Sequence, residues 1–416
     1  MTTHTTDAPV PVSAGTPARL PLVVFVLAAG TFLMLTTEFV IAGILPQVAG
    51  DLGLSLAEAG SLITVFAAGM IVGAPTMALL TMRMSKKLTL VLALVVFVVG
   101  HVVVALSADL TVLLIARFVT AVATGAFWAV AAVVATRAAG PALGSRAMGI
   151  VSAGGALATV IGVPIGAFIA QMSGWRSTFW VLGAAAVVAV VLVARLVPGD
   201  DTTAAASTVR AQLAGLRSGR LWLALLACAT TTGGVLAAYS FIAPILTEQA
   251  GVPVALVPLV LTGFGVGSFV GAILGGRFGD AHPGVVTILV PAVTAVVLVA
   301  ISLSVGAPWL MTALVVVLGL FGLSANGVLI LLAVRFSGEA ATLGSALAVS
   351  AFNAGTAIGT TVAGVALATP LGLQGPAMIG AAIVTTTLIP TIISRAFAEQ
   401  HLMFKRLGIQ AEDAGR

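Results

Sequence analysis

Charged residues are scarce in this chain of 416 residues. Only 7% of its side chains are charged and 60% are hydrophobic, whereas soluble domains carry about 25% charged residues. This composition excludes a soluble globular protein. Cysteine is scarcer still, because Cys228 is the only one and lies in an apolar run. Neither a disulfide framework nor a thiolate metal site can therefore form within the chain.

Catalytic signatures are missing as well. The four histidines are spread over tails, a loop and one apolar run without an HExxH pair. The sequence also has no carboxylate pair, nucleophile motif or phosphate-binding Gly-Lys loop. We therefore expect a protein that is not an enzyme, holds no metal and uses no cofactor, with its energy drawn from an ion gradient or from the substrate's own gradient. The net charge of +5 comes from basic residues scattered between apolar runs, so we expect no nucleic-acid partner.

The chain has instead a series of long apolar runs. A helix needs about 20 residues to cross a bilayer core of ~30 Å, and twelve runs reach that length. The first run is too long for a signal-peptide core and has no convincing cleavage site, so it is a membrane span. The sequence predicts an all-α integral membrane protein with twelve transmembrane helices. We place them near residues 21–45, 60–81, 88–106, 110–136, 146–170, 177–197, 221–246, 256–276, 284–304, 308–334, 341–368 and 376–395.

Basic residues alternate with these spans. With the amino terminus inside, all but two of the 18 lysines and arginines fall in cytoplasmic segments, whereas Asp51, Glu58, Asp109 and Glu248 fall in outer loops. Such an arrangement follows the positive-inside rule. We therefore expect a multi-pass protein of the cytoplasmic (inner) membrane with both termini in the cytoplasm.

Two pairs of segments indicate an internal repeat. Residues 151–170 align without gaps with residues 349–368, and residues 44–50 are similar to residues 245–251. Together the two matches predict two pseudo-symmetric six-helix bundles. The expected organisation is a disordered cytoplasmic tail 1–20, a first bundle 21–197, a cytoplasmic linker 198–220, a second bundle 221–395 and a cytoplasmic tail 396–416.

Glu38 is the only carboxylate inside any of the apolar runs. A charge at the bilayer centre costs about 2.5–3.5 kcal/mol on insertion scales, so an acid retained there indicates a function. Arg117 lies at equal expected depth, roughly 10 Å below the outer edge of the core, since each residue is about seven positions from the outer end of its span. We interpret the two as proton-coupling residues, because burial disfavours a charged carboxylate and a nearby guanidinium favours it. A static ion pair between two helices is the alternative, and His101 fits a proton relay less well than an interhelical hydrogen bond.

A mostly apolar cavity with a few polar groups is expected around Glu38. Steps of three and four residues place several polar or aromatic side chains on shared helix faces, and Tyr239 occupies the position of Glu38 in the second repeat. This lining suits an amphiphilic, mostly uncharged ligand, while helix packing is the alternative role for each residue. The candidate substrate-binding residues are Met34, Glu38, Ile41, Thr124, Trp128, Tyr239, Phe241, Asn326 and Asn353.

The fifth span contains a proline between small residues, in the segment Gly162, Pro164 and Gly166. Small residues at four-residue spacing let helix backbones approach one another, and proline removes a backbone hydrogen bond and bends the helix. We expect a kinked, close-packed helix that takes part in conformational change.

Four segments carry a family resemblance by their order and spacing. They are TTEFVIAGILPQVAGDLGLS (36–55), GMIVGAPTMALLTMRMSKK (69–87), GVPIGAFIAQMSGWRSTFW (162–180) and GSFVGAILGGRFGDAHP (267–283). These segments resemble the major facilitator superfamily, specifically its twelve-span drug:proton antiporters and the branch with chloramphenicol exporters and sugar-efflux proteins. The resemblance extends over about residues 20–395.

The resemblance implies a rocker switch, in which two bundles tilt about a central site lined by spans 1, 4, 7 and 10. It also implies a gate at the loop with Arg83, Lys86 and Lys87, although Met82 stands where the family has an acid. We therefore expect a monomer that exports amphiphilic drugs in exchange for protons, with chloramphenicol-like compounds favoured. Efflux of sugars or glycosides, proton-coupled nutrient import and a non-transporting membrane protein are the alternatives.

Overall fold

The computed structural model describes residues 20–80, 84–140, 143–199, 216 and 218–394. All regular structure within these ranges is helical, and twelve helical stretches are long and apolar enough to cross a membrane. The predicted all-α architecture with twelve spans is thus confirmed. Arg83, the tail 396–416 and all but a few residues of the tail 1–20 and the linker 198–220 lie outside the described residues.

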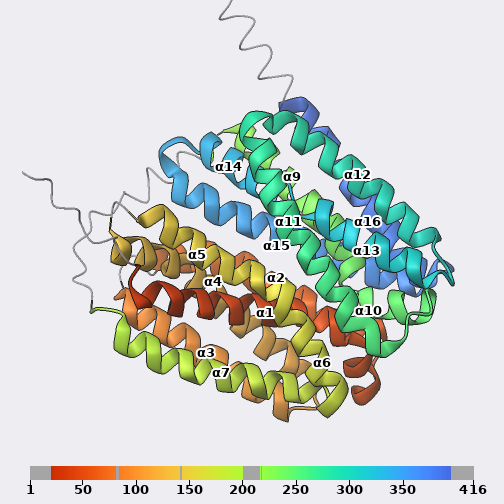
Figure 1. Ribbon diagram of the computed structural model, residues 1–416, viewed down its shortest axis with the longest axis horizontal. Helices are drawn as coiled ribbons and strands as arrows, with labels where there is room; N and C mark the ends of the chain where they lie inside the picture. The colour runs from red at the N-terminus through yellow and green to blue at the C-terminus, as the bar shows by residue number, and fades with distance from the viewer. Residues whose placement is uncertain (1–19, 81–83, 141–142, 200–215, 217, 395–416) are drawn as a thin grey trace, which may run out of the picture.

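The first six spans are formed by seven helices and one π-helical segment (Figure 1). Most spans are single helices, but the fifth consists of α5, the π-helical segment η2 and α6. The elements are α1 (Leu22–Leu52), α2 (Leu56–Leu80), α3 (Lys86–Leu106), α4 (Leu110–Ala139), α5 (Gly144–Leu157), η2 (Ala158–Gly162), α6 (Val163–Ser173) and α7 (Trp175–Leu196).

The second six spans contain more breaks than the first. The seventh span is followed by a short helix and a second π-helical segment, and the tenth is divided into two helices. The elements are α9 (Gly219–Tyr239), α10 (Ile242–Pro244), η4 (Ile245–Gln249), η5 (Val254–Leu256), α11 (Val257–Ala281), α12 (Pro283–Leu303), α13 (Pro308–Gly322), α14 (Asn326–Phe336), η6 (Gly338–Ala340), α15 (Ala341–Leu367), η7 (Gly372–Gln374) and α16 (Gly375–Thr386).

Local signals set the helix ends. The carboxylate of Asp109 caps α4 by accepting a hydrogen bond from Val112 N at 3.0 Å. A capping box begins α2: the Ser55 hydroxyl accepts from Glu58 N at 3.2 Å, and the Glu58 carboxylate accepts from Ser55 N at 2.8 Å. Gly53 ends α1 in the left-handed region, with φ of 64°, where glycine has no steric cost. These caps produce the short connections between antiparallel neighbours.

The first span is longer than the sequence suggested. We expected it to end near residue 45, before Pro46, but α1 continues through this proline to Leu52. Proline is tolerated in a transmembrane helix when neighbouring helices compensate for the lost backbone hydrogen bond. Val48 and Ala49, which follow the proline, are buried in the core of the molecule. Tertiary packing therefore overrides the helix-breaking signal at Pro46.

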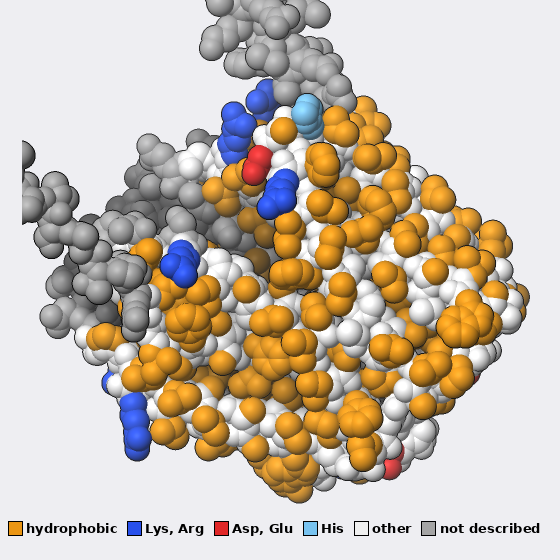
Figure 2. Space-filling view, in the orientation of Figure 1, with side chains coloured by type: hydrophobic (Ala, Val, Ile, Leu, Met, Phe, Trp, Pro, Cys, Tyr) orange, Lys and Arg blue, Asp and Glu red, His pale blue; other side chains and the backbone are white. Residues whose placement is uncertain are grey.

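Charges are distributed unequally between the two ends of the bundle. We call the end with Lys86, Arg137, Arg195 and Arg277 the basic end, and the opposite end, with Asp51 and Asp109, the acidic end. Figure 2 shows lysine and arginine side chains along the upper-left edge of the molecule and apolar side chains over the broad band between the ends. The exposed apolar band is what a lipid-facing surface requires.

The molecule consists of two bundles of six spans each, α1–α7 and α9–α16, coloured red to yellow-green and green to blue in Figure 1. Across the boundary α2 packs against α15, and α11 packs against η2 and α6. One apolar core at the acidic end contains residues of both halves, including Ile41, Leu45, Phe241 and Leu261. Two other cores, nearer the basic end, each lie within a single half. The halves are therefore joined most closely at the acidic end.

Candidate proton-coupling and substrate site

Arg117 is fully buried in α4, with 1% of its surface exposed. Its Nη1 donates to the backbone oxygen of Thr37 at 3.0 Å and to the hydroxyl of Thr37 at 3.2 Å. Its Nε donates to the backbone oxygen of Leu62 at 3.5 Å, and the guanidinium carbon lies 4.1 Å from the centre of the Phe66 ring, within cation–π range. Arg117 thereby connects α4 to both α1 and α2.

Glu38 follows Thr37 in α1 and lies close to this arginine. The two charges interact electrostatically, but no direct ion pair joins them among the described residues, and the buried Nη2 of Arg117 has no hydrogen-bond partner there. The Glu38 side chain is partly exposed. The next residue, Phe39, packs edge-on against Tyr239 of the second half, with ring centroids 6.4 Å apart. The carboxylate therefore lies near the junction of the two halves.

A hydrogen-bond chain continues from Thr37 to α3. The Thr37 hydroxyl oxygen is 2.8 Å from Nε2 of His101, and Nδ1 of His101 is 2.7 Å from the backbone oxygen of Phe97. The imidazole is 2% exposed and is stacked on the Phe97 ring at a centroid distance of 3.9 Å. We expected His101 to form a hydrogen bond between helices, and its contact with Thr37 is such a bond.

Sequence reasoning missed the residues that hold Arg117. Thr37, Leu62 and Phe66 were not among the predicted site residues, although all three contact the guanidinium. Thr37 precedes Glu38 directly, but threonines are common in these helices and usually bond their own backbone. A backbone oxygen such as that of Leu62 carries no side-chain signal, so only the fold reveals it.

The candidate substrate residues of the first half differ in accessibility. Thr124 and Met34 are buried against each other, and the Thr124 hydroxyl donates to Met34 Sδ at 3.3 Å. Trp128, one turn further along α4, is partly exposed, and its buried Nε1 has no hydrogen-bond partner within the described part of the chain. Ile41 is buried in the core that both halves share. In this conformation Trp128 and Glu38 are the accessible members of the group.

The candidate residues of the second half lie in two places. Tyr239 packs between Phe39 and Phe264, the latter with a ring centroid 4.3 Å away. Phe241 is fully buried near the acidic end, where its ring fills the space beside Gly60 of α2. Both aromatic side chains therefore bridge the two halves of the molecule.

The two candidate amides lie on α14 and α15. Asn326, at the first residue of α14, donates from Nδ2 to the Thr232 hydroxyl at 3.5 Å, and its buried Oδ1 has no hydrogen-bond partner among the described residues. Asn353 donates from Nδ2 to the backbone oxygen of Val349 within α15 at 3.0 Å. Both amide side chains therefore place polar groups within the second half.

The fifth span is close-packed around the predicted glycine-proline segment. Gly162 ends the π-helical segment η2, two residues before Pro164. A side chain at Gly162 would collide with Thr36, and one at Gly166 would collide with Val40, so α1 packs directly on the backbone of this span. The π-helical turn was not expected, because one extra residue in a turn leaves no signature in the sequence. Lys86 and Lys87, the other predicted gating residues, form the first turn of α3 at the basic end.

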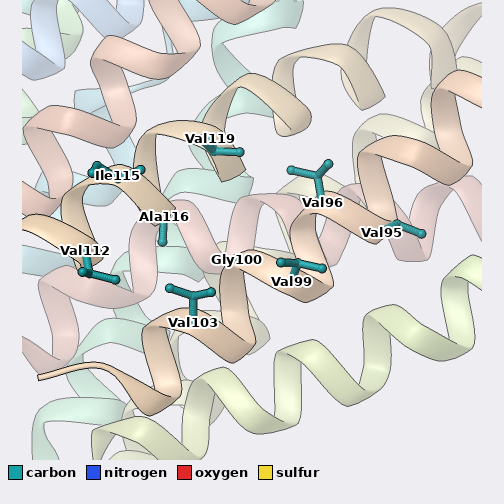
Figure 3. Close-up of a pocket in the computed structure, with 9 residues that line it drawn as sticks. All are labelled: Val95, Val96, Val99, Gly100, Val103, Val112, Ile115, Ala116 and Val119. Carbon is teal, nitrogen blue, oxygen red and sulfur yellow. The ribbon is translucent and has the colours of Figure 1, made fainter.

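An apolar groove of about 350 Å³ lies between α3 and α4. Figure 3 shows valine and isoleucine side chains of both helices directed into it, with Gly100 and Ala116 between them. Several of its lining side chains, including Val99 and Ile115, are exposed on the surface of the molecule. With no charged or polar side chain in its lining, the groove faces the lipid and is separate from Glu38. Its lining residues are Val95, Val96, Val99, Gly100, Val103, Val112, Ile115, Ala116 and Val119.

Comparison with known proteins gives consistent results. Residues 27–360 match the family described as Major Facilitator Superfamily. The chain is 33% identical over 373 residues to a chloramphenicol resistance protein of Streptomyces lividans, with 89% of this chain and 95% of the relative covered. It is 32% identical to the transporter YtbD of Bacillus subtilis (strain 168), with 91% and 95% covered.

A solved structure supports the fold. The crystal structure of a bacterial homologue of the human lysosomal transporter Spinster superposes with a TM-score of 0.68 at 17% identity, covering 90% of this chain and 95% of that one. At this identity the likeness concerns the fold alone. The family match over most of the chain and the relatives above 30% identity show the family as well as the fold. This chain belongs to the major facilitator superfamily and is a membrane transport protein.

Proposed function

We propose that the protein is a proton-coupled exporter that exchanges protons for amphiphilic drugs, with chloramphenicol-like compounds as the favoured substrates. One observation carries the proposal: the only carboxylate in the apolar runs, Glu38, lies near the buried Arg117 without a direct ion pair to it. A relative named as a chloramphenicol resistance protein supports the choice of substrate. We further propose that the protein works as a monomer without a cofactor.

Glu38 would carry the proton in this scheme. The carboxylate interacts electrostatically with Arg117. The buried Nη2 of this guanidinium donates no hydrogen bond to any group in the described structure. An unsatisfied buried donor costs about 1–3 kcal/mol, so a carboxylate that turns toward it is stabilised in the charged form. Rotation of the halves changes the surroundings of Glu38, because the carboxylate lies near their junction. Glu38 would therefore bind a proton in one orientation and release it in the other.

The present conformation fits one half of such a cycle. We propose that the amino terminus is cytoplasmic, which makes the acidic end the outer end. The core shared by both halves then closes the outer side, while each half keeps its own core toward the cytoplasm. In this state Glu38 would release its proton inward and the drug would enter from the cytoplasm or the inner leaflet.

The candidate substrate contacts would change as the halves rotate. Trp128 and Asn326 each hold an unpartnered buried polar atom, which suits them to bind a polar group of the drug in the present state. Ile41 and Phe241 belong to the core at the acidic end. Opening that end would uncover these two side chains, so we propose that they contact the substrate late in the cycle.

Exchange of one proton for one neutral molecule moves one charge inward per cycle. The membrane potential then contributes ~2.3 kcal/mol per 100 mV, enough for roughly 40-fold accumulation. A pH gradient adds to this. If the transport of a neutral drug did not depend on the membrane potential, the proposed stoichiometry would be wrong.

The direct test is drug uptake into everted membrane vesicles. In the wild type, an imposed potential and an acidic interior should drive chloramphenicol inward, and Glu38→Gln should abolish accumulation while leaving drug exchange across the membrane. Glu58→Gln is the matched control, because Glu58 is exposed and only caps α2. Full proton-driven accumulation in Glu38→Gln would refute the coupling role. Accumulation driven by the opposite gradient would instead identify an importer.

A further inference from the structure

His101 is a buried titratable residue that the proposed coupling mechanism does not use. It joins α3 to α1 through Thr37, which is the residue that holds Arg117. The polar groups form a continuous chain from Arg117 through Thr37 and His101 to the backbone oxygen of Phe97. The order of donors and acceptors along this chain determines what His101 does.

The two ends of the chain fix the direction of each hydrogen bond. The guanidinium of Arg117 can only donate, so the Thr37 oxygen accepts from Nη1. At the other end the backbone oxygen of Phe97 can only accept, so Nδ1 of His101 carries a hydrogen and donates it. A neutral imidazole then has its acceptor at Nε2, and the Thr37 hydroxyl donates to it across 2.8 Å. A neutral imidazole in this position is therefore the Nδ1–H tautomer.

Thr37 behaves differently from its neighbours in this respect. The hydroxyls of Thr31, Thr36 and Thr120 each donate to the backbone oxygen four residues earlier, which is the usual arrangement for threonine in a helix. The hydroxyl of Thr37 instead bonds His101 on another helix. Its oxygen lone pairs are consequently directed toward Arg117.

The surroundings of His101 favour a neutral acceptor over a proton carrier. The imidazole is 2% exposed; on α7, the Phe179 ring has its centroid 5.6 Å away and Gly183 lies beside the Cβ of His101. Among the described residues, the charged group that acts on His101 is Arg117 on α4, and Glu38 on α1 acts on Arg117 in turn. A second cation beside the buried Arg117 would be repelled by it. A protonated His101 would also need Thr37 to accept two hydrogen bonds from cations.

We propose that His101 is a positioning residue that, as a permanently neutral acceptor, orients the Thr37 hydroxyl so that both oxygens of Thr37 hold Arg117. The guanidinium thereby stays within electrostatic reach of Glu38 without forming a direct ion pair. The expected effect of His101 on transport rests on the proposed function of Glu38. The tautomer assigned to His101 is independent of that function.

The first test compares variants of the two linking residues by the pH dependence of drug exchange. His101→Phe removes the acceptor and Thr37→Val removes the hydroxyl, so each should release Arg117 toward Glu38. Because a closer opposite charge favours the ionised carboxylate, the profile should move by about one unit to lower pH. The double variant should move it no further, since both changes break the same chain. Unmoved profiles in both single variants would overturn the proposal.

His101→Gln and Thr37→Ser are the conservative controls. Glutamine places an acceptor oxygen near the position of Nε2 but cannot bind a proton, and serine keeps the hydroxyl. Both should retain the wild-type profile. If His101→Gln moved the profile as far as His101→Phe, proton binding by His101 would be the relevant property and the positioning role would be wrong.

The second test needs no transport and no variant at positions 37 or 101. Replacing His4, His282 and His401 leaves His101 as the sole histidine, and nitrogen-15 NMR of the protein in lipid then reports its tautomer. We expect a neutral imidazole with its hydrogen on Nδ1 throughout the range of about pH 5 to 8 in which an unperturbed histidine titrates. An imidazolium signal or the Nε2–H tautomer would overturn the inference. If Glu38→Gln proved fully coupled while the Nδ1–H signal was present, the proposed function would fail and the His101 geometry would stand.

Discussion

The internal repeat of the sequence aligns position 38 with position 239, and the two residues have opposite character. In the first half Glu38 lies near a buried arginine that residues of α1 and α2 hold in place. In the second half Tyr239 lies between the rings of Phe39 and Phe264 and interacts with no ion among the described residues. Of these two aligned positions, only the one in the first half therefore places an acid near a buried cation. At this position the second half contributes an aromatic side chain, and Phe39 of the first half packs against it.

The contacts between the halves show a similar difference. Where α11 meets the fifth span, Gly265 lies so close to the backbone of Thr159 that no side chain would fit. Where α2 meets α15, the contact includes polar groups: the hydroxyls of Thr64 and Thr361 are 3.3 Å apart, and Ser350 donates to the backbone oxygen of Ile71 at 3.2 Å. One boundary is thus a close backbone contact and the other includes hydrogen bonds of hydroxyl groups.

Moving the acid from position 38 to position 239 should have the largest effect on transport and stability. In a double variant, Glu38→Gln with Tyr239→Glu, the new carboxylate would lie between two aromatic rings without a cation. Removing a partner from a buried charge costs about 3–5 kcal/mol, so we expect lower thermal stability and no recovery of the roughly 40-fold accumulation that 100 mV supports. Vesicle uptake and a melting curve in detergent measure both effects. Restored coupling would mean that the two positions are interchangeable.

Replacing the arginine tests whether its geometry matters as well as its charge. Arg117→Lys keeps the cation but cannot bond Thr37 and Leu62 together, because an ammonium lacks the planar fork of a guanidinium. We expect proton-driven uptake to fall about tenfold, equivalent to 1.4 kcal/mol. Arg195→Lys, at an exposed position of α7, is the control and should be unaffected. Equal activity of both lysine variants would reduce the role of Arg117 to that of a point charge.

The smallest effect is expected at Tyr239 itself. Tyr239→Phe keeps the ring contacts with Phe39 and Phe264 and removes a hydroxyl for which the structure shows no hydrogen bond, so proton coupling should stay unchanged. Tyr239→Leu removes aromatic pairs worth about 0.5–1.5 kcal/mol and should weaken drug binding instead. Equilibrium binding in detergent and the proton-to-drug ratio separate the two outcomes. A loss of coupling in Tyr239→Phe would show that both halves handle protons.

Much of this architecture can be predicted from the sequence. The length and hydropathy of the runs give twelve spans, and the fixed rise of a helix puts Glu38 and Arg117 at one depth. The hydrogen bond from Arg117 to Thr37, the residue before Glu38, agrees with that expectation. The bonds to Thr37 and Leu62 were beyond prediction, because they depend on how α1, α2 and α4 are rotated about their axes. Pro46 shows the converse, since its local signal for a helix end is overridden by packing.

The apolar core shared by the halves has a consequence for temperature. A hydrogen bond that crosses the boundary there, from Gln171 Nε2 to the backbone oxygen of Val254 at 2.8 Å, joins uncharged groups. The closure at this end therefore depends chiefly on removing apolar surface from water, a driving force that weakens on cooling and is little affected by screening of charges. Cooling, rather than added salt, should therefore weaken the contact between the two halves at the acidic end.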